Sequence, residues 1–238
     1  MYKTLLLTGA TGGIGEKIAE KFAQEGYALA LLYHDNEAKA AQMQEMYGCP
    51  VYKADISNKD EADWAVNSAV EELGHVDVLI NNAGIALRQK LITEITEDEF
   101  DKVFAVNVKG AFNCIKSALP SMIRRRSGAI INISSVWGVR GAACETVYSA
   151  SKAAVIGLTQ ALAKEVSACN IRVNCIAPGM IDTQMNAHLS DRDKERLRAD
   201  TPLQRLGTAQ DVANACYFLS AEEFITAQTI VVDGGFIS

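Results

Sequence analysis

The chain has 238 residues and a formal charge of −6, with 49% apolar and 22% charged residues. This balance excludes a disordered chain, and the acidic charge argues against nucleic acid as a partner. No apolar run approaches the roughly 18 residues of a membrane span. The six cysteines form no Cys-x-x-Cys pair, so we expect reduced thiols and no metal site. These features predict a cytoplasmic protein.

Short apolar runs alternate with longer amphipathic segments along the chain, which predicts an α/β fold. The order implies one parallel sheet with helices on both faces, in a single domain spanning residues 1–238. The apolar runs are continuous, as strands buried on both sides require. We expect strands at residues 4–8, 28–33, 51–54, 76–80, 129–133, 171–176 and 229–232, and helices near 14–25, 37–47, 58–73, 97–125, 148–168 and 208–220.

Two segments interrupt the alternation. Residues 138–146 are small and polar, and residues 178–206 form a long excursion with a charged helix at 191–198. Long ordered loops in compact domains are usually binding loops or lids, so we predict a substrate lid at about residues 179–206. Met180, Met185 and Leu189 would line it with apolar surface or pack its hinge.

A glycine-rich turn joins the first strand to the first helix. Gly9, Gly13 and Gly15 leave room for a diphosphate at the helix N-terminus, where free N–H groups attract anions. The alternative is a flexible turn without a ligand. The spacing differs from the Gly-x-Gly-x-x-Gly fingerprint of dinucleotide sites.

Small residues also follow the fourth strand, in the sequence Asn81-Asn82-Ala83-Gly84. They would let the backbone approach a flat cofactor, or they form a simple turn. Asp55, after the third strand, could accept a hydrogen bond from an adenine amino group or cap a helix.

The end of the second strand bears on the choice between NAD and NADP. A carboxylate there binds the ribose 2′-hydroxyl of NAD and repels a 2′-phosphate. The strand ends at Tyr33 and His34 without an acid, although Asp35 follows; His34 and Lys39 are the only basic groups near. This pattern favours NADP(H) weakly over NAD(H).

Tyr148 and Lys152 share a helix face because they are four residues apart. A nearby ammonium favours the phenolate and lowers the pKa of a tyrosine from about 10, which suits acid–base work near pH 7. A surface pair without a role is the alternative. Ser135 could hold a substrate oxygen, with Ser134 as the competing candidate and a turn as the plain interpretation. Asn107 lies within a predicted helix, where asparagine is unfavourable, so either it is tolerated on a polar face or its side chain has a role there.

Together, TGATGGIG at Thr8, NNAG at Asn81, Asn107, Ser135, Tyr148-x3-Lys152, Pro178-Gly179 and Thr183 resemble the short-chain dehydrogenase/reductase family over essentially the whole chain. The resemblance implies a Rossmann-type doubly wound sheet of about seven strands, a nicotinamide cofactor and a homotetramer built through the long helices and the last strand. It also implies a catalytic tetrad of Asn107, Ser135, Tyr148 and Lys152. In it, the tyrosine is the acid–base, the serine orients the substrate, the lysine binds the ribose and tunes the tyrosine, and the asparagine holds a water.

The positions that the resemblance assigns to cofactor binding come from the glycine-rich turn, the strand ends and the start of the lid. They are Gly9, Thr11, Gly13, Ile14, Gly15, Tyr33, His34, Asp55, Ile56, Asn82, Ala83, Gly84, Tyr148, Lys152, Pro178, Gly179, Ile181 and Thr183.

Within the family, the chain looks most like 3-oxoacyl-acyl-carrier-protein reductases, on GGIG, RRRSGAIINISS and the VDGG ending. That implies ketone reduction in fatty acid biosynthesis with acyl carrier protein as a partner, docked on Arg126. Cys169 replaces a second docking arginine. The segment from Ser135 to Glu145 instead resembles reductases of a ketone-modified lysine on elongation factor P, and Glu145 would suit an amine-bearing substrate or simply cap a helix. An NADP(H)-binding sensor or scaffold without catalysis is an alternative of another class.

Overall fold

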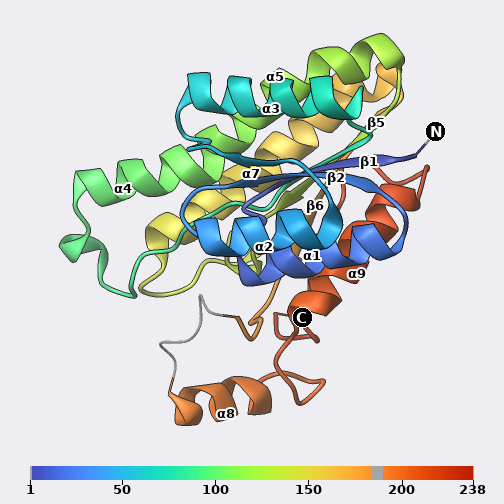
Figure 1. Cartoon of the computed structure of the whole chain (residues 1–238). Helices are drawn as coiled ribbons and strands as arrows, with labels where there is room; N and C mark the ends of the chain where they lie inside the picture. Colours follow the sequence, from blue (N-terminus) through green and yellow to red (C-terminus); the bar gives the residue numbers. More distant parts are fainter. Residues whose placement is uncertain (1, 184–189, 238) are drawn as a thin grey trace.

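The computed structural model describes residues 2–183 and 190–237, and within them seven parallel strands form one sheet (Figure 1). The strand order is β3-β2-β1-β4-β5-β6-β7, so the chain winds outward from β1 and then returns to continue on the other side with β4. Ligands of such sheets bind beyond the carboxyl ends of the strands, where the winding reverses. The strands are β1 Thr4–Thr8, β2 Ala28–Tyr33, β3 Val51–Lys53, β4 Val78–Asn81, β5 Gly128–Ile133, β6 Ile171–Pro178 and β7 Thr229–Val232.

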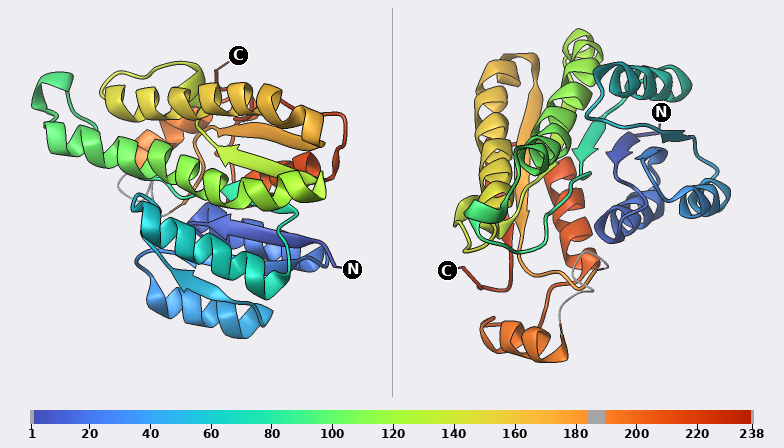
Figure 2. Two further views of the ribbon diagram at one scale, coloured as in Figure 1. Left: turned by 90° about the horizontal axis from the view of Figure 1, so that it is seen from above. Right: turned by 90° about the vertical axis from the view of Figure 1, so that its left-hand side faces the viewer.

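Helices cover both faces of the sheet. Helices α1, α2 and α9 lie on one face, and α3, α5 and α7 lie on the other (Figure 2). The α-helices are α1 Gly13–Gln24, α2 Glu37–Tyr47, α3 Lys59–Leu73, α4 Glu97–Phe104, α5 Ala111–Arg125, α6 Val136–Val139, α7 Thr146–Val166, α8 Asp191–Ala199 and α9 Ala209–Ala221. Short turns of other helix types are η1 Ile92–Glu94, η2 Ala105–Gly110 and η3 Ser167–Cys169.

The central strands are buried on both sides, as their apolar runs predict. In β1, Leu5 and Leu7 belong to the core under α1 and α9, whereas Leu6 belongs to the core under α3, α5 and α7. Successive side chains of a strand point to opposite faces, so an uninterrupted apolar run supplies both cores. The α/β fold with a seven-stranded parallel sheet is therefore confirmed.

Several element boundaries differ from the predictions. Strand β3 ends one residue early, β4 spans 78–81 instead of 76–80, and β5 begins at Gly128. Strand β6 continues through Pro178, which pairs with Val232, although we expected the strand to end at Ile176 and the excursion to begin at residue 178. Proline is tolerated there because the pairing of β6 with β5 ends at Ile176, so its missing N–H removes no hydrogen bond to that strand. Residues 138–146 are also not purely a loop, since Gly138 and Val139 belong to α6.

The long helix predicted at residues 97–125 contains a π-helical turn. Helix α4 ends at Phe104, η2 carries the backbone in π geometry to Gly110, and α5 follows directly. A π-turn adds a residue to one turn and often marks a functional site. Asn107 lies in this turn and is buried.

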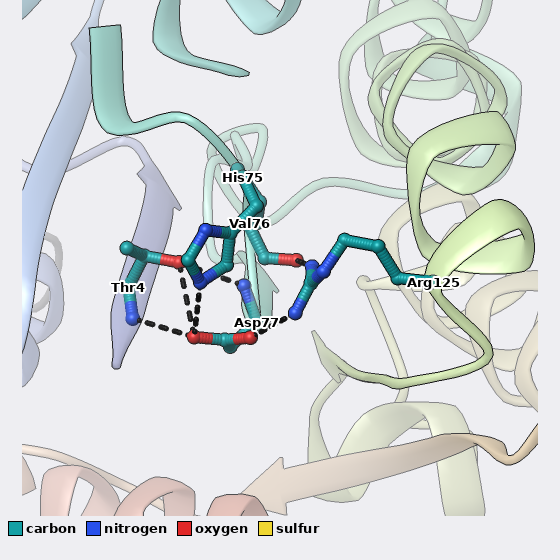
Figure 3. A network of polar contacts seen from close by, with 5 residues as sticks. All are labelled: Thr4, His75, Val76, Asp77 and Arg125. Atoms are coloured by element: carbon teal, nitrogen blue, oxygen red, sulfur yellow. Dashed lines mark hydrogen bonds and ion pairs between the residues drawn. The ribbon is translucent and has the colours of Figure 1, made fainter. Parts of the chain in front are cut away.

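A polar cluster joins the elements at the opposite end of the sheet from the carboxyl strand ends (Figure 3). The Asp77 carboxylate accepts hydrogen bonds from the Thr4 N–H at 3.0 Å and from Arg125, and lies 3.1 Å from His75 Nε2. Arg125 also donates to the carbonyl of Val76 at 2.9 Å. Burial raises the pKa of Asp77, but the Thr4 N–H, Arg125 and His75 outweigh it and hold that pKa below its usual range. The cluster ties β1, β4 and α5 together.

No helix in the described part of the chain is long and apolar enough to cross a membrane.

Candidate active site

Helix α1 begins without a side-chain cap. Its N-cap is Gly12, whereas α2, α3, α4, α8 and α9 begin at residues whose side chains accept a backbone N–H: Asn36, Asn58, Thr96, Ser190 and Thr208. The N–H groups of the first turn of α1 therefore donate no hydrogen bond to a capping side chain. That end of the helix also carries the positive pole of the helix dipole, which suits a phosphate group.

The glycines of this turn are required by close contacts. A Cβ on Gly9 would lie 2.8 Å from Ala83 Cα, and one on Gly15 would lie 2.2 Å from the Gly9 carbonyl oxygen. Gly9 also has a φ of +62°, which disfavours other residues. A Cβ on Gly13 would lie 3.2 Å from the side chain of Thr183, so the start of the predicted lid lies against the glycine-rich turn. These contacts fit a cradle for a dinucleotide diphosphate.

The segment after β4 is fixed to the same turn by side-chain bonds. Asn82 Nδ2 donates to the carbonyls of Thr8 at 3.1 Å and Gly9 at 3.0 Å. In return, Thr8 Oγ1 accepts the N–H groups of Asn82 and Ala83. Asn82 therefore positions the loop, and contact of its amide with a cofactor stays a prediction. Thr8 was not predicted as a site residue, but its hydroxyl and its carbonyl both bind the segment after β4.

Asp55 and Ile56, at the end of β3, make contacts within the protein. Asp55 Oδ1 accepts the Ser57 N–H at 2.9 Å, which makes a local turn before α3. Ile56 packs against Gly110, where a Cβ would lie 2.6 Å from Ile56 Cδ1. Its carbonyl oxygen accepts a hydrogen bond from Asn113. Adenine contacts at these two positions remain predictions.

The end of β2 carries paired charges. His34 Nδ1 lies 2.7 Å from Asp35 Oδ1, and both side chains are exposed, whereas Tyr33 is buried. Lys39 reaches back to Glu16 on α1, with 2.7 Å between its ammonium and the carboxylate. The only acid directly after the strand is therefore held by a histidine, and a lysine lies on the adjoining helix.

Tyr148 and Lys152 occupy successive turns at the start of α7, as their spacing predicts. Lys152 Nζ lies 5.7 Å from the centre of the Tyr148 ring and donates to the Ile133 carbonyl at 2.9 Å. The Ser135 hydroxyl interacts with Tyr148. Ser135 Oγ also accepts the Trp137 N–H at 3.2 Å. Ser135 therefore caps α6 and interacts with the Tyr148 phenol at the same time.

The pKa values of this pair reflect burial more than mutual attraction. Burial raises the pKa of Tyr148 to about 12; the Ser135 hydrogen bond lowers it, and Glu145 adds to the rise. Burial lowers the pKa of Lys152 to about 8, opposed by Cys175. The prediction that the ammonium brings the phenol near neutrality is therefore wrong for the protein without cofactor, because desolvation disfavours both charges.

Asn107 connects the turn after β4 to α7. Its Oδ1 accepts the Ile85 N–H at 2.8 Å, and its Nδ2 donates to the Ile85 carbonyl at 2.9 Å and to Ser151 Oγ at 3.0 Å. Ser151 in turn donates to the Tyr148 carbonyl at 2.8 Å. Both amide hydrogens thus go to protein atoms, and the implied role in holding a water stays a prediction. Ser151 was not predicted as a site residue, although it follows Tyr148 by three residues on the same helix face.

Asn107 and Lys152 converge on Gly84. A Cβ at Gly84 would lie 3.1 Å from Lys152 Nζ and 3.2 Å from Asn107 Oδ1. The structure therefore brings together NNAG, the π-turn and α7, which are distant in the sequence. The buried Asn81 has an Oδ1 without a hydrogen-bond partner, while its Nδ2 donates to Asn132 at 2.8 Å.

The remaining predicted positions lie at the end of β6. Gly179 is required by Asp233, whose Cβ would be 2.6 Å from a Cβ added there. Ile181 is buried and pairs with Gly207 in an isolated bridge, which fixes both ends of the excursion. Thr11 and Ile14 belong to the glycine-rich turn and the start of α1. Met185 and Leu189 lie outside the described residues.

Comparisons with known proteins agree with this arrangement. Residues 9–237 match a family model described as enoyl-(acyl carrier protein) reductase. The chain belongs to the short-chain dehydrogenase/reductase family. It is 43% identical to 3-oxoacyl-[acyl-carrier-protein] reductase FabG of Staphylococcus aureus, covering 99% of this chain and 98% of that protein. FabG of Thermotoga maritima is 39% identical over the same shares.

Solved structures of this family superpose closely. "ElxO with NADP Bound" has a TM-score of 0.92 and 34% identity, with 100% of this chain and 99% of that chain covered. Levodione reductase also has a TM-score of 0.92, with 31% identity and coverage of 98% and 96%. The protein is thus an oxidoreductase of the family with a Rossmann-type fold, and the relatives differ in the substrates that their names state.

Proposed function

We propose that the protein reduces a ketone with NADP(H), with Tyr148 as proton donor. The observation that carries this proposal is the placement of Tyr148, Ser135 and Lys152 together beyond the carboxyl ends of β4 and β5. The uncapped N-terminus of α1 supplies the diphosphate site at the same edge of the sheet. When bound, the reduced nicotinamide supplies a hydride to the carbonyl carbon.

The side chains would divide the remaining work. Tyr148 donates its phenolic proton to the ketone oxygen, and Ser135 donates a hydrogen bond to the same oxygen. The Trp137 N–H donates to Ser135 Oγ and so helps to orient that hydroxyl. A phenol kept protonated by burial is the form that reduction needs. Lys152, fixed at Ile133, presents positive charge to the phenol and so stabilises the phenolate that the step leaves.

NADP(H) is the favoured cofactor. The Asp35 carboxylate, which would repel a 2′-phosphate, is paired with His34, and Lys39, paired with Glu16, lies on the adjoining helix α2. A structural relative is named as bound to NADP. Dissociation constants for NADPH and NADH, measured by fluorescence, test this: we expect the NADPH constant to be the lower one, and Asp35→Asn to lower it further.

The substrate class is proposed from the curated relatives: a 3-oxoacyl thioester carried on acyl carrier protein. Arg126, the implied docking residue, lies before β5, at the opposite end of that strand from Ser135. The six-residue strand separates them by about 20 Å. A carrier protein bound to Arg126 would therefore serve the catalytic end of this chain only by spanning the strand's length.

A ketone that carries an amine is the second candidate, as in ketone-modified lysine on elongation factor P. Glu145 favours it, because its carboxylate is close enough to raise the pKa of Tyr148. A negative charge there attracts a cationic substrate and gives no benefit to a neutral thioester.

Steady-state NADPH oxidation with acetoacetyl thioester and with amino-ketones tests both candidates. If amino-ketones are preferred, Glu145→Gln raises their KM at least tenfold and leaves the thioester KM unchanged. If the thioester is preferred, Glu145→Gln leaves the KM values for both substrates as they are in the wild type. A chain that binds NADPH but turns over no ketone would be the sensor or scaffold instead.

A further inference from the structure

Two serines follow β5, and the structure gives them different partners. Ser135 interacts with the phenol of Tyr148. The Ser134 hydroxyl is buried and donates to the main-chain carbonyl of Lys152 at 2.8 Å. The Ser134 N–H is itself fixed, because it donates to the Ile176 carbonyl at 2.7 Å. Ser134 is therefore a rigid support placed between the sheet and the first turns of α7.

The same strand end holds the other end of the lysine. Lys152 Nζ donates to the carbonyl of Ile133, the residue directly before Ser134, at 2.9 Å. Two consecutive residues thus bind Lys152 at its ammonium and at its carbonyl. Gly84 also lies close to the ammonium, since a Cβ added at Gly84 would be 3.1 Å from Lys152 Nζ. Lys152 has 4% of its surface exposed, and both its ammonium and its carbonyl are held by hydrogen bonds to the end of β5.

Gly138 shows how tightly the contact is enclosed. A Cβ there would lie 2.7 Å from both Ser134 Oγ and the Lys152 carbonyl carbon. Helix α6 can pass over the bond between Ser134 and Lys152 only because this position has no side chain. Water is therefore kept from the Lys152 carbonyl, and a lost Ser134 hydroxyl would not be replaced by solvent.

We propose that Ser134 is a positioning residue that fixes the Lys152 ammonium relative to the Tyr148 phenol and the cofactor. The inference rests on the proposed function, which gives Lys152 and Tyr148 their roles. Without the Ser134 hydroxyl, the main chain of α7 at Lys152 loses this hydrogen bond to the end of β5, and only the Lys152 ammonium stays bonded to Ile133. We expect the first turns of α7 to shift as a result. A displacement well below 1 Å is enough to slow a reaction severalfold, since 1 Å can cost about a hundredfold.

The test is Ser134→Ala, with Ser220→Ala as the matched control. Ser220 is also buried and donates to a helix carbonyl, that of Tyr217 at 2.7 Å, but it lies on α9 on the other face of the sheet. Three quantities are measured: kcat for ketone reduction, the midpoint of the pH profile for alcohol oxidation, and the dissociation constant of NADPH. Thermal unfolding confirms that both variants fold.

For Ser134→Ala we expect kcat to fall about tenfold, the pH midpoint to rise by at least about half a pH unit, and the NADPH dissociation constant to rise about threefold. Ser134→Cys, which keeps a weak donor of similar size, should lie between this variant and the wild type. Ser220→Ala should change none of the three. Wild-type kcat, pH midpoint and NADPH affinity in Ser134→Ala would overturn the proposal. If the wild type turns over no ketone, the proposed function fails, and NADPH affinity alone decides the role of Ser134.

Discussion

Lys152 shows at the scale of one residue how the site trades stability for chemistry. An ammonium buried against Ile133 and Gly84 has its pKa lowered to about 8 because burial disfavours the charge. In the unfolded chain the same group has a pKa near 10.5. At pH 7 it is charged in both states, and the folded state bears the desolvation cost.

We predict that Lys152→Met stabilises the protein without cofactor while it abolishes activity. Removing the buried charge should raise the free energy of unfolding by about 3 kcal/mol. The pKa of Lys152 falls from 10.5 to about 8 on folding, and one pKa unit corresponds to about 1.4 kcal/mol. Losing the bond to Ile133 offsets about 1 kcal/mol of this. The expected net gain in the free energy of unfolding at pH 7 is about 2 kcal/mol, measured by denaturant titration.

The pH dependence of this gain has a definite sign. Between pH 8 and 10.5 the unfolded wild-type chain binds more protons than the folded one, so wild-type stability rises through that window. The advantage of Lys152→Met should therefore shrink by pH 10. Lys164→Met, an exposed position on the same helix, is the control and should change stability little at either pH. A Lys152→Met protein less stable than the wild type at pH 7 would contradict this account.

The residues that sequence reasoning located best are those with a role visible in spacing. Tyr148 and Lys152 are four residues apart on one helix, and the glycines follow a strand directly; the structure places both groups at the carboxyl strand ends. Ser134 and Ser135 were left as alternatives because adjacent residues differ only in the direction in which their side chains point, and the sequence alone does not give that direction. The prediction of a lowered pKa for Tyr148 was wrong for another reason. Burial raises this pKa, and burial depends on the surrounding fold, which residue spacing does not reveal.

At the scale of elements, strand existence was predictable and strand ends were not. A buried parallel strand is recognised by its apolar run, but hydrogen bonds to neighbouring strands decide where it ends. Pro178 remains in β6 because β7 pairs with it. The π-turn around Asn107 leaves no mark on apolar periodicity, since it is fixed by side-chain bonds to Ile85 and Ser151 from distant segments.

We predict that the cluster around Asp77 contributes to the free energy of unfolding. Arg125→Met removes both bonds from the end of α5 to the start of β4, so we expect a loss of about 1–2 kcal/mol in the free energy of unfolding. Arg124→Met, the exposed neighbour, should cost almost nothing. The pKa of Asp77 is lowered in the folded state, so the cluster's contribution is present above about pH 4 and is lost as the pH falls. Equal stability of the two variants at pH 7 would refute this role.

For the whole molecule, we propose a homotetramer, built through the long helices and β7. Large apolar side chains are exposed on α5, α9 and β7: Phe112 and Ile123 on α5, Phe218 on α9 and Val231 on β7. Such surface is favourable to cover with a second copy. Sedimentation should give four times the 25.7 kDa protomer mass, and Phe112→Lys should dissociate it. Trp64→Lys, exposed on α3 outside these elements, should leave the tetramer intact. A monomeric wild type at micromolar concentration would contradict the proposal.

In the proposed reaction, Tyr148 supplies the proton that completes ketone reduction. The decisive experiment compares Tyr148→Phe with the wild type for NADPH oxidation in the presence of a ketone and for NADPH affinity. We predict a loss of at least about a thousandfold in turnover, within the range that proton transfer contributes, and a dissociation constant within about twofold of the wild type. A phenylalanine variant that reduces the ketone at the wild-type rate would contradict it.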